Sequence, residues 1–272
     1  MVGIALPPIK AHYATGLMYG VKLNTLFALM IDDVTKGVLQ IYKQQEHRIT
    51  FDATPSNILA NWLNKRLRKW SSVFAKLVPG IVVDFVNDVD NNIKRELTKG
   101  ITQELTNLHA QPNVIKSFTV KMSEDSKRAL NAQQALIKNN VALITNISDD
   151  TRKKIYNDVM EASMQGRNLQ YLTEKLRALN QFPEKRIKLI ARDQINKATG
   201  AINAARQADL GIKKNIWRHS HGDKEPRPDH LAADGRIYDI DKGCPISGEN
   251  IYPGQLINCT CFSQPYLEFL EE

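Results

Sequence analysis

Three cysteines and one histidine in the last third of the chain are the residues best suited to chemistry. Cys259 and Cys261 form a Cys-x-Cys pair, Cys244 lies fifteen residues before it, and His230 lies in a loop stiffened by prolines. Thiolates and imidazoles are the ligands that zinc prefers, and four of them make a structural zinc site. The sequence therefore offers a candidate zinc site of His230, Cys244, Cys259 and Cys261. The alternative is a set of small buried thiols without a metal.

An enzymatic hypothesis depends on the same histidine. Placed beside Asp229 or Asp234, His230 could serve a metal-dependent nuclease or hydrolase as a ligand or general base. The chain has no phosphate-binding GxxxxGK[ST] loop, no GxSxG elbow and no HExxH helix. We therefore predict that the protein is not an enzyme. The metal-dependent hydrolase and a zinc-stabilised interaction module are the two alternatives.

The positive charge of the chain is concentrated in one stretch. The whole chain has 37 Lys and Arg against 29 Asp and Glu, a net charge of +8. Residues 166–228 contain 14 of these basic and 6 of the acidic residues, which accounts for the full +8, whereas residues 229–272 contain 2 and 8. Such a stretch could contact double-stranded DNA, or it could be a solvated helix surface. The candidate contacts to DNA or a partner are Lys185, Arg186, Lys188, Arg192, Arg206, Lys213 and Lys214.

The elements that must position these residues differ on the two sides of Gly211. Before it, apolar residues recur at helical spacing, and Gly211 itself has the residue type of a left-handed helix cap. After it, short β-rich runs alternate with loops rich in Gly, Pro and Asp. The prediction is a predominantly α-helical α+β protein, with a helical body followed by a small mixed C-terminal module. We expect an arm and amphipathic helix at 1–50, a helical region at 51–145, the module-bearing domain at 146–265 and an acidic tail at 266–272.

Local signals refine the helical body. Pro79-Gly80 predicts a helix break, residues 114–120 (VIKSFTV) suggest a short strand, and Ser148-Asp149-Asp150 suggests a helix start. The segment from Pro183 to Leu210 predicts one long helix with a buried apolar stripe. A polar stripe of the same helix suits packing on the C-terminal module better than contact with phosphates. Its members are Arg192, Asn196, Thr199, Asn203 and Arg206.

Composition limits the class of protein. An apolar content of 42% supports an ordinary core, and three cysteines are too few for a disulfide-stapled secreted scaffold. The N-terminus shows neither a charged signal-peptide start nor an uninterrupted apolar run of membrane-spanning length. We therefore expect synthesis in the cytoplasm and no membrane partner.

From about Ile147 to Pro265 the chain resembles the Mu F-like head-morphogenesis (minor capsid) proteins of tailed phages. The resemblance rests on ordered segments that read ISDDTRKKIYNDVMEASMQGRNLQYLTEKL, ARDQINKATGAINAA, GIKKNIW, RPDHLAADG and NCTCFSQP. The matching positions are Arg192, Trp217, Arg227, His230, Gly235, Pro253, Cys259, Cys261 and Pro265. The chain departs from the family at Asp193, Gln194 and Thr260, where Thr, Glu and Arg are usual, so we expect no catalytic role there.

This resemblance implies a virion protein, present inside the head near the portal and involved in head assembly. It further implies contacts with the portal protein and with the major capsid or scaffolding protein, and a role in DNA packaging or ejection. Some relatives carry a toxin domain after the Cys-x-Cys segment, and we expect none here. The N-terminal 145 residues are not covered by the resemblance and are candidates for portal or capsid contacts.

Overall fold

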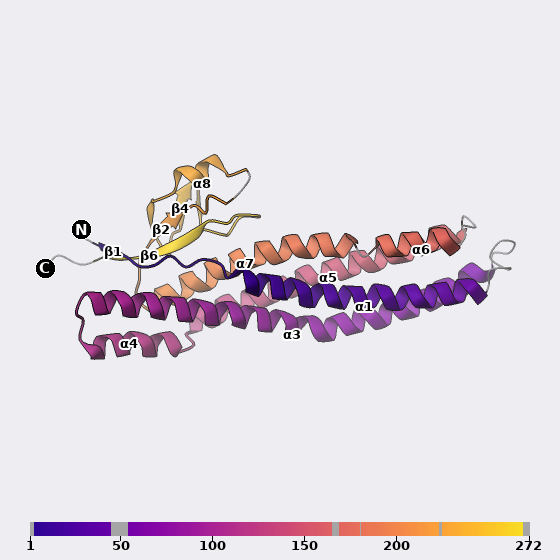
Figure 1. The fold of residues 1–272 in the computed structure, drawn as a ribbon, viewed down its shortest axis with the longest axis horizontal. Coiled ribbons are helices and arrows are strands. Elements are labelled where there is room, and N and C mark those ends of the chain that lie inside the picture. The colour runs from indigo at the N-terminus through magenta and orange to yellow at the C-terminus, as the bar shows by residue number, and fades with distance from the viewer. Residues whose placement is uncertain (1–2, 45–53, 165–168, 180, 223–224, 269–272) are drawn as a thin grey trace. The chain divides into compact units, whose positions relative to one another are not determined.

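A computed structural model describes residues 3–44, 54–164, 169–179, 181–222 and 225–268. Residues 1–2 and 45–50 of the predicted arm and residues 269–272 of the predicted acidic tail lie outside this range. The long helices are α1 (Tyr13–Gln44), α3 (Thr54–Asn107), α5 (Lys127–Met164) and α7 (Gln181–Asp209). The shorter helices are α4 (Pro112–Ser123), α6 (Leu169–Ala178) and α8 (Pro228–Ala232). Together with the small sheets that follow, these helices confirm the predicted helix-dominated α+β class (Figure 1).

The chain folds into two compact units, each assembled from several segments. One unit comprises residues 18–83 and 139–190 and is purely helical in its described part. Its core is made of apolar stripes such as that of Phe27 and Phe74, whose rings meet edge to face at 4.7 Å between centroids. Asp33 of α1 accepts hydrogen bonds from Arg66 and from Trp70 Nε1 of α3, which fixes the register of these two helices.

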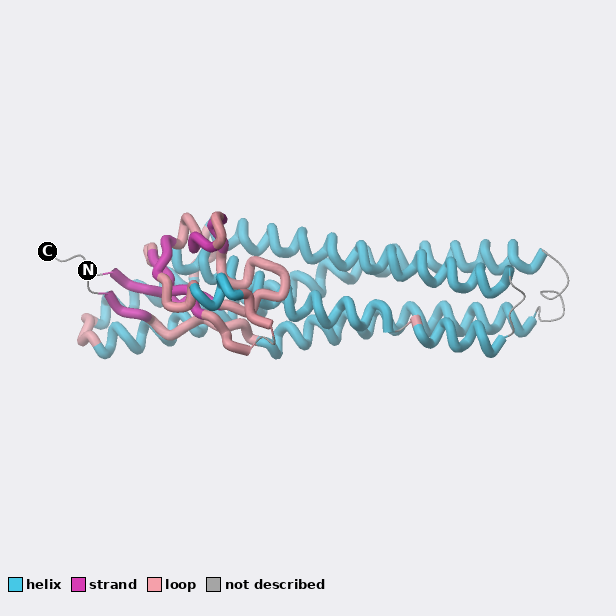
Figure 2. Tube along the Cα trace, turned by 90° about the horizontal axis from the view of Figure 1, so that it is seen from above, coloured by secondary structure: helices cyan, strands magenta, loops and turns pink. Residues whose placement is uncertain are grey.

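The other unit comprises residues 1–17, 84–138 and 191–272, and it contains the strands. A four-stranded antiparallel sheet has the order β1 (Gly3–Ala5), β6 (Phe262–Glu268), β2 (Lys214–Arg218), β3 (Ile237–Asp239). A hairpin of β4 (Cys244–Ile246) and β5 (Glu249–Ile251) completes the module. Figure 2 shows these strands and the short α8 gathered in one place. The N-terminal segment, expected to be an extended arm, thus supplies an edge strand to the C-terminal sheet.

Three local predictions about helices are wrong. Helix α3 continues through Pro79, because Phe74, Val78 and Val82 bury one continuous face on both sides of the proline. Residues 114–120 belong to α4, which begins at Pro112, where the missing N–H of proline costs nothing. Residues 148–150 lie inside α5, and the two carboxylates form ion pairs with Arg152 and Arg186 rather than opening a helix.

Helix α1 is the one helix in the described ranges that is long and apolar enough to cross a membrane, judged by length and composition alone. Polar residues such as Lys22 and Asp32 interrupt its sequence, so no uninterrupted apolar run marks it. Of its most apolar 18-residue window, 44% is buried. A core helix of a helical protein meets the same criteria, so the feature does not by itself indicate a membrane.

Candidate metal centre and the module around it

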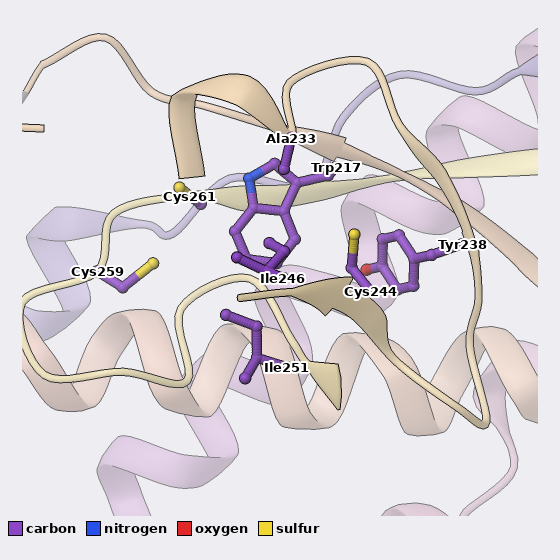
Figure 3. Close-up of a cluster of buried hydrophobic side chains, with 8 residues drawn as sticks. All are labelled: Trp217, Ala233, Tyr238, Cys244, Ile246, Ile251, Cys259 and Cys261. Carbon is purple, nitrogen blue, oxygen red and sulfur yellow. The ribbon is translucent and has the colours of Figure 1, made fainter. Parts of the chain in front are cut away.

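Trp217 is the centre of the C-terminal module. Its side chain is fully buried in the middle of β2, among Ala233, Tyr238, Ile246 and the three cysteines (Figure 3). Its backbone N–H donates to Arg236 O at 2.8 Å, and its carbonyl accepts from Gly235 N at 2.9 Å. Gly235 has a φ of +84°, a conformation that residues with side chains rarely adopt. This turn therefore fixes the family positions Trp217 and Gly235 together.

His230, Cys259 and Cys261 converge beside this tryptophan. His230 lies on α8, whereas the two cysteines lie on the segment that leads into β6. His230 Nδ1 is 3.5 Å from Cys259 Sγ and 3.6 Å from Cys261 Sγ, and all three residues are buried. The His230 ring meets the Trp217 ring edge to face, with centroids 5.1 Å apart. Among the described residues, these three have ligand atoms that all lie within 4.8 Å of one another.

The electrostatics of this cluster favour a thiolate. The hydrogen bond from the Cys261 thiol lowers the pKa of Cys259 to about 5, although burial acts in the opposite direction. Backbone N–H groups of Cys261 and Gly254 act in the same direction as the Cys261 thiol. A thiolate is the form in which cysteine binds metals.

Cys244 is not part of the cluster, which corrects the predicted four-residue set. It lies on β4, and Figure 3 shows its sulfur beside Tyr238, away from the sulfurs of Cys259 and Cys261. Burial raises the pKa of the Cys244 thiol, as expected for a small apolar core residue. The spacing of the three cysteines could not reveal this, because the β4–β5 hairpin turns the chain between them.

The two aspartates near His230 are engaged elsewhere. Asp229 accepts a hydrogen bond from Ser247 Oγ at 2.8 Å, and this bond lowers its pKa. Asp234 accepts the backbone N–H of His219 at 3.0 Å and lies 3.4 Å from His221 Nε2. Both carboxylates therefore stabilise turns of the module, and neither belongs to the group of candidate ligands.

Helix α7 meets the module through small residues and amides. A Cβ at Gly200 would lie 2.6 Å from Pro253 O, and one at Gly254 would lie 2.8 Å from Asn196 O. Asn203 Nδ2 donates to Ser263 Oγ of β6 at 2.9 Å. The predicted packing of the polar stripe on the module is confirmed for Asn196 and Asn203, whereas Arg206 of the same stripe contacts Asp90 and Asp125 instead. Pro253, a family position, matters here because its carbonyl fits against a helix surface without a side chain.

Two departures from the family pattern have structural roles that the sequence did not indicate. Asp193 Oδ1 accepts the backbone N–H of Asn258 at 3.0 Å, and Asn258 has a left-handed φ of +58°. Thr260 Oγ1 lies 2.6 Å from Ser220 Oγ. Both contacts hold the segment that carries Cys259 and Cys261. Asp193 directly follows Arg192 on a helix, and this local sequence gives no signal of a contact with residue 258.

The remaining family positions are structural as well. Arg227 precedes α8 and donates through Nη2 to Ile257 O at 2.9 Å. Pro265 lies opposite Asn215 in the β2–β6 pair, and its carbonyl accepts the Leu6 N–H at 2.9 Å. Arg227 thus connects the start of α8 to the segment just before Cys259, and Pro265 connects the N-terminal segment to β6.

Arg206 is removed from the predicted DNA contacts. Its side chain is buried and donates to both carboxylate oxygens of Asp90, to Asp125 and to Glu124 O. Arg186 pairs with Asp150 at 2.7 Å, and Lys188 pairs with Glu184 at 2.7 Å. Lys214 is half-buried in β2, whereas the following side chains are exposed: Lys185, Lys188, Arg192 and Lys213. Arg192 also lines a cavity of about 410 Å³ between α7, β6 and residues 9–13.

The sequence of the C-terminal part of the chain matches a known protein family. Residues 153–263 match the family described as "Phage Mu protein F like protein". This part of the chain is similar to that family. The match begins within α5 and ends in β6, so it includes Trp217, His230 and both clustered cysteines.

One relative of known sequence covers nearly the whole chain. It is an uncharacterized protein of Haemophilus influenzae, 29% identical over 267 residues. The aligned region is 97% of this chain and 56% of that protein, so the chain spans about half the length of its curated relative. No solved structure is significantly similar to the chain.

Proposed function

We propose that the chain is a minor head protein of a tailed bacteriophage that docks inside the head near the portal. In this role it contacts the portal protein and the major capsid or scaffolding protein. It assists head assembly and the packaging or ejection of DNA. The observation that carries the proposal is the family match over residues 153–263, which covers α6, α7 and the module around Trp217.

The location is tested on purified phage heads. We expect quantitative mass spectrometry to find the protein in heads at a copy number far below that of the major capsid protein. We also expect immobilised portal protein to retain the full chain. The proposal would be contradicted if heads assembled in the presence of the protein did not contain it and if the immobilised portal protein retained none of it.

Contact with DNA is a separate part of the proposal. It rests on exposed basic side chains of the stretch 166–228, of which Arg192 and Lys213 belong to the unit that contains the module. Each phosphate contact releases counterions, so log K should fall with log salt by about 0.9 per contact on duplex DNA. Replacing Arg192 and Lys213 together by serine should therefore make the slope shallower by up to about 2.

The matched control removes two exposed lysines outside that stretch, Lys65 and Lys76. This variant changes the net charge by the same amount, and we expect its salt slope to equal that of the wild type. Equal slopes for all three proteins would show that the basic stretch does not contact phosphates. An equal loss in both variants would show that only net charge matters.

A further inference from the structure

We propose that His230, Cys259 and Cys261 bind one zinc ion through Nδ1 and the two Sγ atoms, with a solvent molecule as the fourth ligand. The proposal does not depend on a role in the phage head. It assigns to the module a metal centre whose purpose is to hold α8 against the segment that leads into β6. The following steps argue from the ligands, the distances and the surroundings.

The distances between the ligand atoms match those around zinc. With Zn–N and Zn–S bonds of about 2.0 and 2.3 Å at tetrahedral angles, N and S atoms are separated by about 3.5 Å. The observed separations from His230 Nδ1 are 3.5 Å to Cys259 Sγ and 3.6 Å to Cys261 Sγ. Both distances from the imidazole nitrogen therefore fit a tetrahedral zinc site, and the two sulfurs lie within 4.8 Å of each other.

The surroundings of the three ligand atoms suit a bound ion. His230, Cys259 and Cys261 are all buried, and His230 Nδ1 lies near both sulfurs. The other ring nitrogen of His230, Nε2, is buried and has no hydrogen-bond partner among the described residues. Zinc binds cysteine sulfur and imidazole nitrogen, which are the atoms that meet here.

The supporting structure orients the ligands before any ion binds. Trp217 packs edge to face on the His230 ring, and Asp229 Oδ1 accepts the His230 backbone N–H at 2.9 Å. On the other side, Asp193 holds Asn258 in its left-handed conformation, directly before Cys259. Ligands fixed in this way lose little freedom when they bind an ion.

The first test is the metal content of the full-length protein, purified without chelators and analysed by elemental mass spectrometry. We expect about one zinc per chain. Replacing Cys259 or Cys261 by serine should reduce this to below about a tenth of an ion. Cys244→Ser removes a buried thiol of the same module and should keep the full content. Wild-type protein with less than about a tenth of an ion would overturn the proposal, as would equal loss in Cys244→Ser.

A second measurement uses only the wild-type protein, so it remains valid if the cysteine variants fail to fold. Cobalt added to the chelator-stripped protein should give the intense visible bands of a tetrahedral site and a sulfur-to-cobalt charge-transfer band in the near ultraviolet. Thiol titration in denaturant without a reductant should find all three cysteines of the chain reduced. A single reactive thiol would indicate a Cys259–Cys261 disulfide and would contradict the metal site. Octahedral cobalt spectra without the charge-transfer band would contradict it too.

Discussion

Two helical glycines show that the surroundings of a Cα atom decide whether a side chain can be added there. Gly200 of α7 lies against the carbonyl of Pro253, whereas at Gly80 of α3 no atom beyond its chain neighbours and the adjacent helix backbone lies within 4 Å of the position of a Cβ. Both residues are glycines inside long helices, and although Gly80 follows a proline, the local sequence does not show that only Gly200 is closely approached by another segment. Only the long-range contact with residue 253 gives Gly200 its purpose.

Replacing these glycines by alanine should therefore have opposite effects. Gly200→Ala should destabilise the protein by about 1–3 kcal/mol, because the new methyl group would lie 2.6 Å from Pro253 O. Gly80→Ala should stabilise it by about 0.5–1 kcal/mol, because alanine loses less backbone entropy in a helix. Urea unfolding measures both. Effects of the same sign would show that the approach of Pro253 to α7 is not as close as the structure has it.

Residue-level predictions from the sequence succeeded where burial follows helical spacing. The apolar stripe of α7, which includes Ile187, Ile195 and Ile202, is buried as predicted. On α1, however, Leu17 and Val21 fit the apolar spacing but are 67% and 48% exposed. Of the predicted metal ligands, the structure brings three together and leaves Cys244 apart. Spacing gives the residue types of a site, whereas the turns between them decide which atoms meet.

At the scale of elements, one buried arginine connects three parts of its unit. Arg206 of α7 forms two hydrogen bonds of 2.8 and 2.7 Å to Asp90 of α3. It also binds Asp125 and Glu124 O in the connection between α4 and α5. The sequence suggested a DNA contact here, because an arginine on a polar stripe has the same pattern whether its partner is a phosphate or a carboxylate.

Removing this arginine alone should be costly. Arg206→Met leaves the buried Asp90 carboxylate with Lys94, 3.1 Å away, as its remaining ionic partner, so we expect a loss of at most about 3–5 kcal/mol. The double variant Arg206→Met, Asp90→Leu should recover most of that loss, because no isolated charge remains buried. Arg128→Ala is the control: its ion pair with Asp241 is exposed, and its removal should cost about 1 kcal/mol or less. A double variant as unstable as the single one would contradict this account.

Element boundaries were predicted well only where the local signal and the packing agree. Gly211 ends α7 with a φ of +80°, and Ile212 N donates to Gln207 O at 3.0 Å, as the residue type predicted. Pro79 carries an equally strong local signal, but α3 continues because the buried face on both sides outweighs one lost hydrogen bond. The sequence alone does not show which of these two forces is stronger.

At the scale of the whole molecule, neither compact unit is a continuous segment. The strand of residues 3–5 pairs with residues 266–268, and the two units divide α1, α3, α5 and α7 between them. A single sequence contains no local pattern for a pairing across more than 260 residues. The α+β class was predictable because apolar residues recur at helical spacing over most of the chain and short β-rich runs follow Gly211. The path of the chain through the two units was not predictable from the sequence.

Carboxylates that are paired with arginines in both units should make the free energy of unfolding depend on pH in the acidic range. The hydrogen bond from Arg66 lowers the pKa of Asp33, and the hydrogen bond from Arg206 lowers the pKa of Asp125. Because the folded pKa is the lower one, their contribution is present above the unfolded pKa of about 3.9 and is lost as pH falls through the folded values. Urea unfolding from neutral pH downward should show stability declining below about pH 5. The Asp33→Asn variant should be less stable than the wild type at neutral pH, but its stability should fall less steeply as the pH is lowered. Parallel stability curves for the two proteins would contradict the assignment of part of this pH dependence to Asp33.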